Sequence, residues 1–265
     1  MTVVLFSVAA LGVIAIIFGA ALGYAGIKFK VEEDPKLAEL HGHLPGANCG
    51  GCGHTGCWNW MQAVYDGTEK PEACGVLSAD ALKEIGRIMD IEVTPPEQKK
   101  SFVCCIGDDT NSGFRYEYRG AGGCAAMMRL AGGGCKACGY GCLGGGSCVT
   151  ACKFGAITII NGIAATDPDK CTSCGICETI CPKKNIKMIP AGAKIFVACS
   201  SKENARAVRI ACDIGCIGCK LCEKICKFGA IRVADNLAEI DYSKCTGCGT
   251  CAESCPRGVI KKGPS

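Results

Sequence analysis

The sequence CKFGAITIINGIAATDPDKCTSCGICETICP, residues 152–182, contains most of what determines this architecture. It returns at residues 226–256 as CKFGAIRVADNLAEIDYSKCTGCGTCAESCP, and the later cysteine run starts 19 residues after the opening cysteine in both copies. Each copy closes on C-x2-C-x2-C-x3-C-P, the spacing that places thiolates around cubane [4Fe-4S] clusters. Because chance does not easily produce this register twice, the sequence predicts two modules of one design.

Each of these runs requires a partner run upstream. In bacterial ferredoxin runs, three cysteines hold one cluster and the fourth, before proline, crosses to a second cluster. The second module has a regular partner run, CIGCKLCEKIC. The partner run in the first module has wider gaps of three, five and three residues, and the glycines at 144–146 give this longer loop its conformational freedom. The stretches between the runs predict short β-hairpins. Crossing ligation predicts four clusters, held by Cys138, Cys142, Cys148 and Cys181; by Cys152, Cys171, Cys174 and Cys177; by Cys216, Cys219, Cys222 and Cys255; and by Cys226, Cys245, Cys248 and Cys251.

A different cysteine motif, LPGANCGGCGHTGC, occupies residues 44–57. Together with one later cysteine it supplies the four thiolates that a cubane needs, and its glycines let backbone amides approach the sulfurs. A structural zinc site is the alternative. Since four cysteines are present, we interpret His54 as a surface or hydrogen-bonding residue, and His41 and His43 as part of a solvated linker. The fifth predicted cluster is held by Cys49, Cys52, Cys57 and Cys74.

Two helices are predicted beside this motif. The stretch WNWMQAVYDG, residues 58–67, has helical apolar spacing. Ser78 is a suitable N-cap for a second helix, on which Leu82, Ile85 and Met89 form one apolar stripe.

Six cysteines remain after these assignments. The segments KSFVCC and KIFVACSS each read as the start of a strand–helix unit, so two cysteines from each unit would converge on a sixth cluster. The alternative is that they are buried free thiols, because cysteine also packs as a small apolar residue. The predicted sixth set is Cys105, Cys124, Cys199 and Cys212, and Cys104 and Cys135 stay unassigned.

The composition supports metal ligation over disulfides. Cysteine accounts for 26 of 265 residues, and disulfide frameworks belong to short secreted domains. With 6% aromatic residues, the clusters must replace much of the apolar core, so we expect little stable fold without them. The formal net charge is +4, but each cluster with its thiolates adds about two negative charges. We therefore expect an acidic loaded protein and no nucleic-acid partner. The glycine runs at 120–123 and 132–134 lack nucleotide-binding patterns, so we predict no flavin or NAD on this chain.

An uncharged stretch covers residues 3–27, which at about 1.5 Å per residue is long enough to cross a hydrocarbon layer of about 30 Å. A cleaved signal peptide, the alternative, would have basic residues ahead of a shorter apolar run. Lys28 and Lys30 follow the stretch directly, and the positive-inside rule then places the rest of the chain in the cytoplasm, where thiols stay reduced. We predict a single-pass anchor in the cell (inner, cytoplasmic) membrane, in contact with lipid.

These parts predict an α+β chain. A transmembrane helix precedes a small, mostly helical [4Fe-4S] domain and two bacterial ferredoxin-like modules, each with two clusters. The predicted parts are a transmembrane helix at 1–28, a linker at 29–44, the [4Fe-4S] domain at 45–92, a strand–helix segment at 93–134, the first module at 135–190, a strand–helix connector at 191–214 and the second module at 215–265.

Taken together, the motifs resemble the B subunit of the Rnf complex, the ion-translocating ferredoxin:NAD oxidoreductase of bacterial membranes. The resemblance covers the whole chain and rests on the apolar N-terminal stretch, LPGANCGGCGHTGC, GYGCLGGGSCVTACKFGAI and the ferredoxin runs, in that order. It implies a subunit that accepts electrons from reduced ferredoxin and passes them toward flavin-bearing subunits, where NAD reduction drives Na+ or H+ across the membrane. Short family members carry one ferredoxin pair, so this chain resembles an extended form. Lys153 and Lys227 stand where a ferredoxin run usually has proline after Cys152 and Cys226, which affects the local turn more than ligation.

We therefore expect an electron-transfer subunit that is an enzyme only within a complex of membrane and peripheral subunits, with soluble ferredoxin as the donor. Nothing in the sequence calls for bond-making catalysis by this chain alone. A membrane-bound redox sensor, another polyferredoxin subunit and a metal-storage protein are the alternatives; a sensor would need an effector domain, and a storage protein has no use for the doubled register. Lysines beside the ligands either steer an acidic ferredoxin or are merely solvated. They are Lys183, Lys184, Lys187, Lys220, Lys224 and Lys227.

Overall fold

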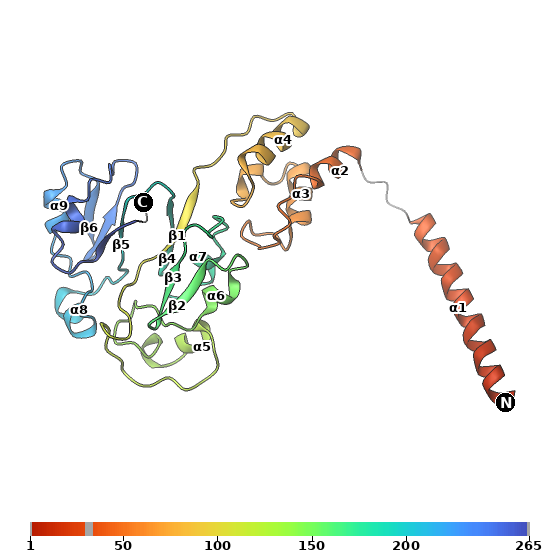
Figure 1. Ribbon diagram of the computed structural model, residues 1–265, viewed down its shortest axis with the longest axis horizontal. Helices are drawn as coiled ribbons and strands as arrows, with labels where there is room; N and C mark the ends of the chain where they lie inside the picture. The colour runs from red at the N-terminus through yellow and green to blue at the C-terminus, as the bar shows by residue number, and fades with distance from the viewer. Residues whose placement is uncertain (1, 30–33, 264–265) are drawn as a thin grey trace. The chain divides into compact units, whose positions relative to one another are not determined.

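The computed structural model describes residues 2–29 and 34–263, and contacts divide the chain into two units, residues 1–42 and 43–265 (Figure 1). Short helices and two-stranded sheets share the second unit, so the predicted α+β class is confirmed. Lys30, which we used to orient the chain in the membrane, lies outside the described residues.

Helix α1 (Thr2–Lys28) is the segment predicted to span the membrane. Its 27 residues carry no charge before Lys28 and correspond to about 40 Å at about 1.5 Å per residue. Large apolar side chains such as Phe6, Ile14 and Leu22 are exposed along it, as expected for a surface that hydrocarbon would cover. One N-terminal helix is therefore long and apolar enough to span a membrane.

A short helix lies within the segment that we predicted as a solvated linker. Helix α2 (Pro35–His41) begins after Asp34, whose side chain accepts a hydrogen bond from Lys36 N at 2.8 Å, and proline at the first helical position suits a helix start. His41 ends the helix, and both His41 and His43 are half-buried rather than fully solvated. The segment is thus partly ordered by its own capping signal.

The regular elements of residues 43–92 are helices, and the rest of this part is irregular. Helix α3 (Cys57–Tyr65) buries Trp60, Met61 and Val64 on one face, and the 3-10 turn η1 (Pro71–Ala73) leads to Cys74. In α4 (Ala79–Met89) the Ser78 side chain accepts a hydrogen bond from Ala81 N at 3.2 Å, which confirms the predicted N-cap. Leu82, Ile85 and Ile88 form its buried stripe.

Two hairpins form the predicted strands beside the cysteine runs. Strand β2 (Ile157–Ile160) pairs with β3 (Ile163–Thr166), and β6 (Ile231–Ala234) pairs with β7 (Leu237–Ile240), both antiparallel. The tight turns use positive φ at Asn161 and Gly162 in the first hairpin and at Asp235 and Asn236 in the second.

A second sheet in each module joins residues that lie far apart in the sequence. Strand β1 (Lys99–Val103) pairs with β4 (Ile186–Pro190), and β5 (Ile195–Val197) pairs with β8 (Ile260–Lys262). Val103 faces Ile186, and Val197 faces Ile260, which are matching positions of the repeat. Each upstream strand therefore belongs to the module that follows it. Phe102 and Phe196, again matching residues, pack in a tilted arrangement with ring centroids 4.7 Å apart.

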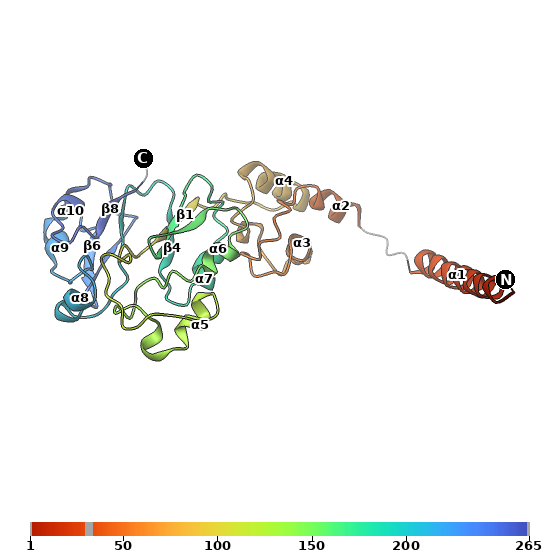
Figure 2. The same cartoon turned by 60° about the horizontal axis from the view of Figure 1, so that its bottom comes forward.

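The modules are built from one- or two-turn helices and a small core (Figure 2). Cysteines share this core with Ile157, Ala164 and Ile186 in the first module and with Ile231 and Leu237 in the second. Helices of five residues are not stable by themselves, so they depend on the packing of their cysteine side chains into this core. The helices are α5 (Cys124–Met128), η2 (Ala131–Gly133), α6 (Ser147–Ala151), α7 (Ile176–Ile180), α8 (Ala205–Ala211), α9 (Leu221–Ile225) and α10 (Thr250–Glu253).

Candidate iron-sulfur centres

The motif at residues 44–57 surrounds a cavity of about 360 Å³. Asn48 shapes it: its side-chain oxygen accepts a hydrogen bond from Cys57 N at 2.8 Å, and its backbone N–H donates to Cys57 Sγ at 3.4 Å. Burial raises the pKa of the Cys74 thiol, and the charges of Cys52 and Cys57 add to this rise. The structure brings together Cys49, Cys52, Cys57 and Cys74 around this cavity.

His54 lies outside the set of residues that line the cavity. Its Nε2 is 3.6 Å from Glu69 Oε2. A backbone hydrogen bond from Lys70 lowers the pKa of the Glu69 carboxyl, and His54 contributes in the same direction. His54 therefore lies beside a carboxylate and away from the cavity, and its predicted hydrogen-bonding role stays a prediction.

The 44–57 motif packs directly on the first module. Cys174 also lines the cavity of the motif. A Cβ atom on Gly75 would lie 2.5 Å from the Ser173 carbonyl oxygen, so only glycine permits this approach. Lys153 Nζ donates a hydrogen bond to Asn48 O at 2.7 Å. The lysine that stands in place of the usual proline thus links the two parts.

Cys171, from the second predicted set of the first module, lies beside strand β1. The Ser101 backbone N–H and hydroxyl both lie 3.5 Å from Cys171 Sγ, and Lys100 Nζ donates to Cys171 O at 2.6 Å. Burial acts to raise the pKa of the Cys171 thiol, but hydrogen bonds from Ser101 and Ser173 and the charge of Lys100 bring it below its usual value. Burial raises the pKa of Cys177 to about 11. Electrostatic interactions link Cys174 to Cys49, Cys152 and Cys171, and link Cys177 to Cys171 and Cys174. The predicted set is Cys152, Cys171, Cys174 and Cys177.

The other cavity of the first module contains a cysteine that we had placed elsewhere. This cavity of about 360 Å³ is lined by Cys124 where we predicted Cys138. Cys124 N donates to Ser147 Oγ at 2.8 Å, which fixes the start of α5 beside the glycine loop. Burial, together with the charges of its neighbours, raises the pKa of Cys148 to about 12. The cysteines that line the cavity are Cys124, Cys142, Cys148 and Cys181.

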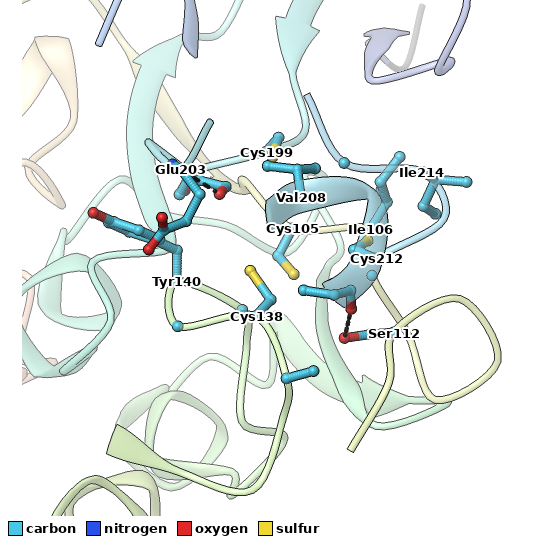
Figure 3. Close-up of a pocket in the computed structure, with 18 of the residues that line it drawn as sticks. Cys105, Ile106, Ser112, Cys138, Tyr140, Cys199, Glu203, Val208, Cys212 and Ile214 are labelled. Atoms are coloured by element: carbon cyan, nitrogen blue, oxygen red, sulfur yellow. Dashed lines mark hydrogen bonds between the residues drawn. The ribbon is translucent and has the colours of Figure 1, made fainter. Parts of the chain in front are cut away.

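Cys138 lies instead in a cavity of about 790 Å³ between the two modules, shown in Figure 3. Cys142 N donates a hydrogen bond to Cys105 Sγ at 3.3 Å, and in the matching position Cys216 N donates to Cys199 Sγ at 3.4 Å. Burial raises the pKa of Cys105 to about 12. The cavity thus receives two cysteines from each half of the repeat. The four are Cys105, Cys138, Cys199 and Cys212, and Cys104 lies beside them.

A short sequence repeat, separate from the spacing of the runs, indicates that Cys138 belongs to the junction cavity and Cys124 to the first-module cavity. ACGYGC at residues 137–142 and ACDIGC at residues 211–216 share the pattern A-C-x-x-G-C and lie 74 residues apart, as do the paired ferredoxin runs. Cys138 therefore matches Cys212, not a ligand of the regular second-module run. Because the run has no cysteine within the wider gap after Cys142, it supplies too few ligands for the first-module cavity. Cys124 on α5 takes the remaining position at that cavity.

In the second module, one cavity lining matches the first predicted set, and the second set stays a prediction. A cavity of about 390 Å³ is lined by the first set of four cysteines, and burial raises the pKa of Cys222 to about 11. In the other set, burial raises the pKa of Cys251, with the charges of Cys245 and Cys248 adding to it, and Cys226 lies in the same core cluster. Cys219 and Cys248 are the exposed cysteines of this module. The cysteines that line the cavity are Cys216, Cys219, Cys222 and Cys255. The predicted second set is Cys226, Cys245, Cys248 and Cys251.

The donor chemistry suits iron–sulfur clusters. All 26 cysteines are free thiols, and backbone N–H groups of Ala156, Ala164 and Asn185 are directed at sulfur atoms, as in sites that tune a cluster by hydrogen bonding. Within residues 2–29 and 34–263, no three His, Cys, Asp or Glu side chains close around a single metal-ion position. Cys104 and Cys135 are buried, and the Cys135 carbonyl accepts a hydrogen bond from an arginine backbone N–H.

Comparisons with known proteins agree with this chemistry. Family models described as "4Fe-4S binding domain" match residues 164–187 and 238–261, and residues 215–229, and one described as "Putative Fe-S cluster" matches residues 44–76. The chain is 38% identical over 261 residues to the B subunit of the ion-translocating oxidoreductase complex of Methanosarcina acetivorans, with 98% of each protein covered.

Two further relatives are similar along nearly all of this chain. It is 39% identical over 258 residues to the B subunit of the Na(+)-translocating ferredoxin:NAD(+) oxidoreductase complex of Acetobacterium woodii, covering 97% of this chain and 77% of that protein. It is 40% identical over 265 residues to the B subunit of the proton-translocating ferredoxin:NAD(+) oxidoreductase complex of Clostridium ljungdahlii, covering 98% and 93%. The similarity therefore includes the apolar helix, the 44–57 motif and both modules.

Proposed function

The chain belongs to the B-subunit family of ion-translocating ferredoxin:NAD(+) oxidoreductase complexes, and from this membership we propose that it relays electrons from reduced ferredoxin through six [4Fe-4S] sites toward its membrane anchor. Within such a complex it is an oxidoreductase component with other subunits as partners. In this proposal flavin and NAD bind to those other subunits and not to this chain. The proposal places residues 43–265 on the cytoplasmic side, with α1 in contact with lipid.

Six sets of four cysteines support the proposal. The single observation that carries it is the cavity between the modules, because two matching cysteines from each half enclose it. A bound [4Fe-4S] cluster supplies a redox centre that accepts and returns an electron. The proposed ligands are Cys49, Cys52, Cys57 and Cys74; Cys152, Cys171, Cys174 and Cys177; Cys124, Cys142, Cys148 and Cys181; Cys105, Cys138, Cys199 and Cys212; Cys216, Cys219, Cys222 and Cys255; and Cys226, Cys245, Cys248 and Cys251.

Three direct contacts support a linear order of the proposed sites. Cys174 of the first module lines the cavity of the 44–57 motif. The junction set contacts the first module through the Cys142 N–H on Cys105 Sγ, and the second through the Cys216 N–H on Cys199 Sγ. One backbone amide therefore separates neighbouring sets on each side of the junction. The proposed path runs from the second module, across the junction, through the first module and into residues 43–92.

The second module is the proposed docking site for ferredoxin. Its Cys219 and Cys248 are exposed, and Lys220, Lys224 and Lys227 are exposed beside them. In the first module Lys184 and Lys187 are also exposed, whereas Lys183 Nζ donates to Gly139 O at 2.5 Å. A basic surface around exposed ligands would attract an acidic ferredoxin, and this attraction weakens as salt screens it.

The relay is tested by rapid mixing of the intact, detergent-solubilised chain with reduced ferredoxin, followed by freeze-quench electron paramagnetic resonance. Cys138→Ala should stop the path at the junction: second-module centres become reduced at the normal rate, and the centre at residues 49–74 does not. Cys135→Ala, a neighbouring buried thiol, is the matched control and should behave as the unmodified protein. Normal reduction of the 49–74 centre in Cys138→Ala would contradict the proposal.

Docking is tested separately by salt. The rate of reduction by ferredoxin should fall steeply between low and high ionic strength, and Lys220→Gln with Lys224→Gln should flatten this dependence. Lys170→Gln, which removes an exposed lysine paired with Asp167, is the control. A salt-independent rate in the unmodified protein would exclude electrostatic steering at this surface.

A further inference from the structure

Lys136 is a buried lysine beside the junction between the modules. Only 1% of its side chain is exposed. Its Nζ donates hydrogen bonds to Gly107 O at 2.9 Å and Gly162 O at 3.2 Å, and lies 3.5 Å from Asp109 Oδ1. An ammonium group has three donors, so these three acceptors account for all of them. A buried cation that is this fully coordinated stays in a fixed position, although burying it costs free energy.

The lysine lies next to two of the proposed ligand sets. It stands two residues before Cys138, and its side chain packs against Gly141, the residue before Cys142, with Cδ 3.7 Å from where a glycine Cβ would be. Its Nζ is bonded to Gly107 O, two residues after Cys105, and to Gly162 O, two residues before Ala164, whose N–H donates to Cys142 Sγ at 3.5 Å. Its positive charge is therefore felt by the junction set and by the adjoining first-module set.

The internal repeat provides a built-in comparison for this charge. Lys183 and Arg257 occupy matching positions 74 residues apart, and each donates to backbone carbonyls of its own A-C-x-x-G-C loop, Lys183 to Gly139 O and Arg257 to Cys212 O. These two cations are therefore equivalent in the two modules. Lys136, by contrast, matches Ile210, whose side chain is 77% exposed. The first module thus has a buried cation for which the second has no counterpart at the matching position.

We propose that Lys136 is a positioning residue for electron transfer, whose fixed buried charge makes the Cys124, Cys142, Cys148 and Cys181 site a better electron acceptor than its counterpart in the second module. Reduction adds one negative charge to a centre, and a nearby cation in a low-dielectric interior stabilises that charge. The midpoint potential of the first-module site is thereby raised. The asymmetry favours transfer from the second module to the first, and so toward the membrane anchor. This inference rests on the proposed function.

The test is a redox titration of the intact chain, followed by electron paramagnetic resonance, with iron content measured on the same samples. Cys148→Ser identifies the signal of the first-module site. Lys136→Met, which keeps a similar volume without the charge, should shift the midpoint potential of that signal downward. Lys202→Met removes an exposed lysine that is also paired with an aspartate, Asp235, and should leave all potentials unchanged.

A second variant keeps the test decisive if Lys136→Met does not fold. Asp109→Asn removes the countercharge from a side chain that is 45% exposed, so the lysine charge is less neutralised and the midpoint potential should shift upward. Unchanged potentials in iron-replete Lys136→Met, or a downward shift in Asp109→Asn, would overturn the inference. These outcomes differ from failure of the proposed function, in which the 49–74 centre would be reduced at the normal rate in Cys138→Ala.

Discussion

Substituting Gly75 with alanine should loosen the contact between the 44–57 motif and the first module. The Gly75 backbone does not adopt a positive φ, so the cost of the added methyl group is steric and not conformational. Its Cβ would lie 2.5 Å from the Ser173 carbonyl oxygen and 3.3 Å from the carbonyl carbon. Since nonbonded contacts settle near roughly 3.5 Å, the two backbones must separate by about 1 Å.

The energetic consequence can be estimated from this displacement. Inserting a methyl group against backbone that cannot turn away costs about 1–3 kcal/mol. At about 1.4 kcal/mol per factor of ten, the equilibrium that keeps residues 43–92 docked would weaken by about five- to hundredfold, with tenfold near the middle of the range. Residues 91–97, which connect this part to strand β1, are largely exposed, so the connecting segment contributes little to docking.

Amide hydrogen exchange measures this change directly. Peptides covering residues 48–57 and 171–177 should exchange about tenfold faster or more in Gly75→Ala, and electrons should reach the 49–74 centre more slowly. Gly192→Ala is the matched control, because a Cβ there has no neighbour within 4 Å. Exchange and transfer rates in Gly75→Ala that equal those of the unmodified protein would refute the packing argument.

Three further predictions address ligation, pH dependence and a helix cap. Cys124→Ala should lower the iron content by about four atoms per chain from about 24 and remove one first-module centre; full iron content would contradict the assignment of Cys124. Burial raises the pKa of Tyr242 to about 12, so the neutral phenol is favoured in the folded state: stability that is complete below pH 10 should be lost as pH rises toward 12, and Tyr242→Phe should remove this loss in thermal unfolding. Ser78→Ala should destabilise the helical part by about 1 kcal/mol in denaturant unfolding, and an unchanged midpoint would mean that α4 does not depend on its cap.

Local patterns in the sequence predicted local structure well. The capped helix α4, the two hairpins and the apolar helix each follow from residues within about ten positions of one another, so their periodicity and turn chemistry are sufficient. The doubled cysteine runs also predicted iron–sulfur modules, because the spacing of ligands is a local property.

Contacts between distant segments could not be predicted in this way. Spacing alone pairs Cys138 with the run that follows it, whereas Cys124, on a helix preceded by an irregular loop, enters that cavity only in three dimensions. Strand β1 pairs with β4 across more than 80 residues, and no pattern within β1 specifies that partner. The A-C-x-x-G-C repeat was the available signal, and comparing the two halves residue by residue would have found it.

The junction between the modules has a consequence for how such chains can grow. Phe102 meets Phe196, its own counterpart, and Cys105 shares a cavity with Cys199, also its counterpart. A contact in which both partners offer the same patch is isologous, and isologous contacts close on themselves. Two copies therefore saturate this interface. A third module appended to the chain would need a different contact surface.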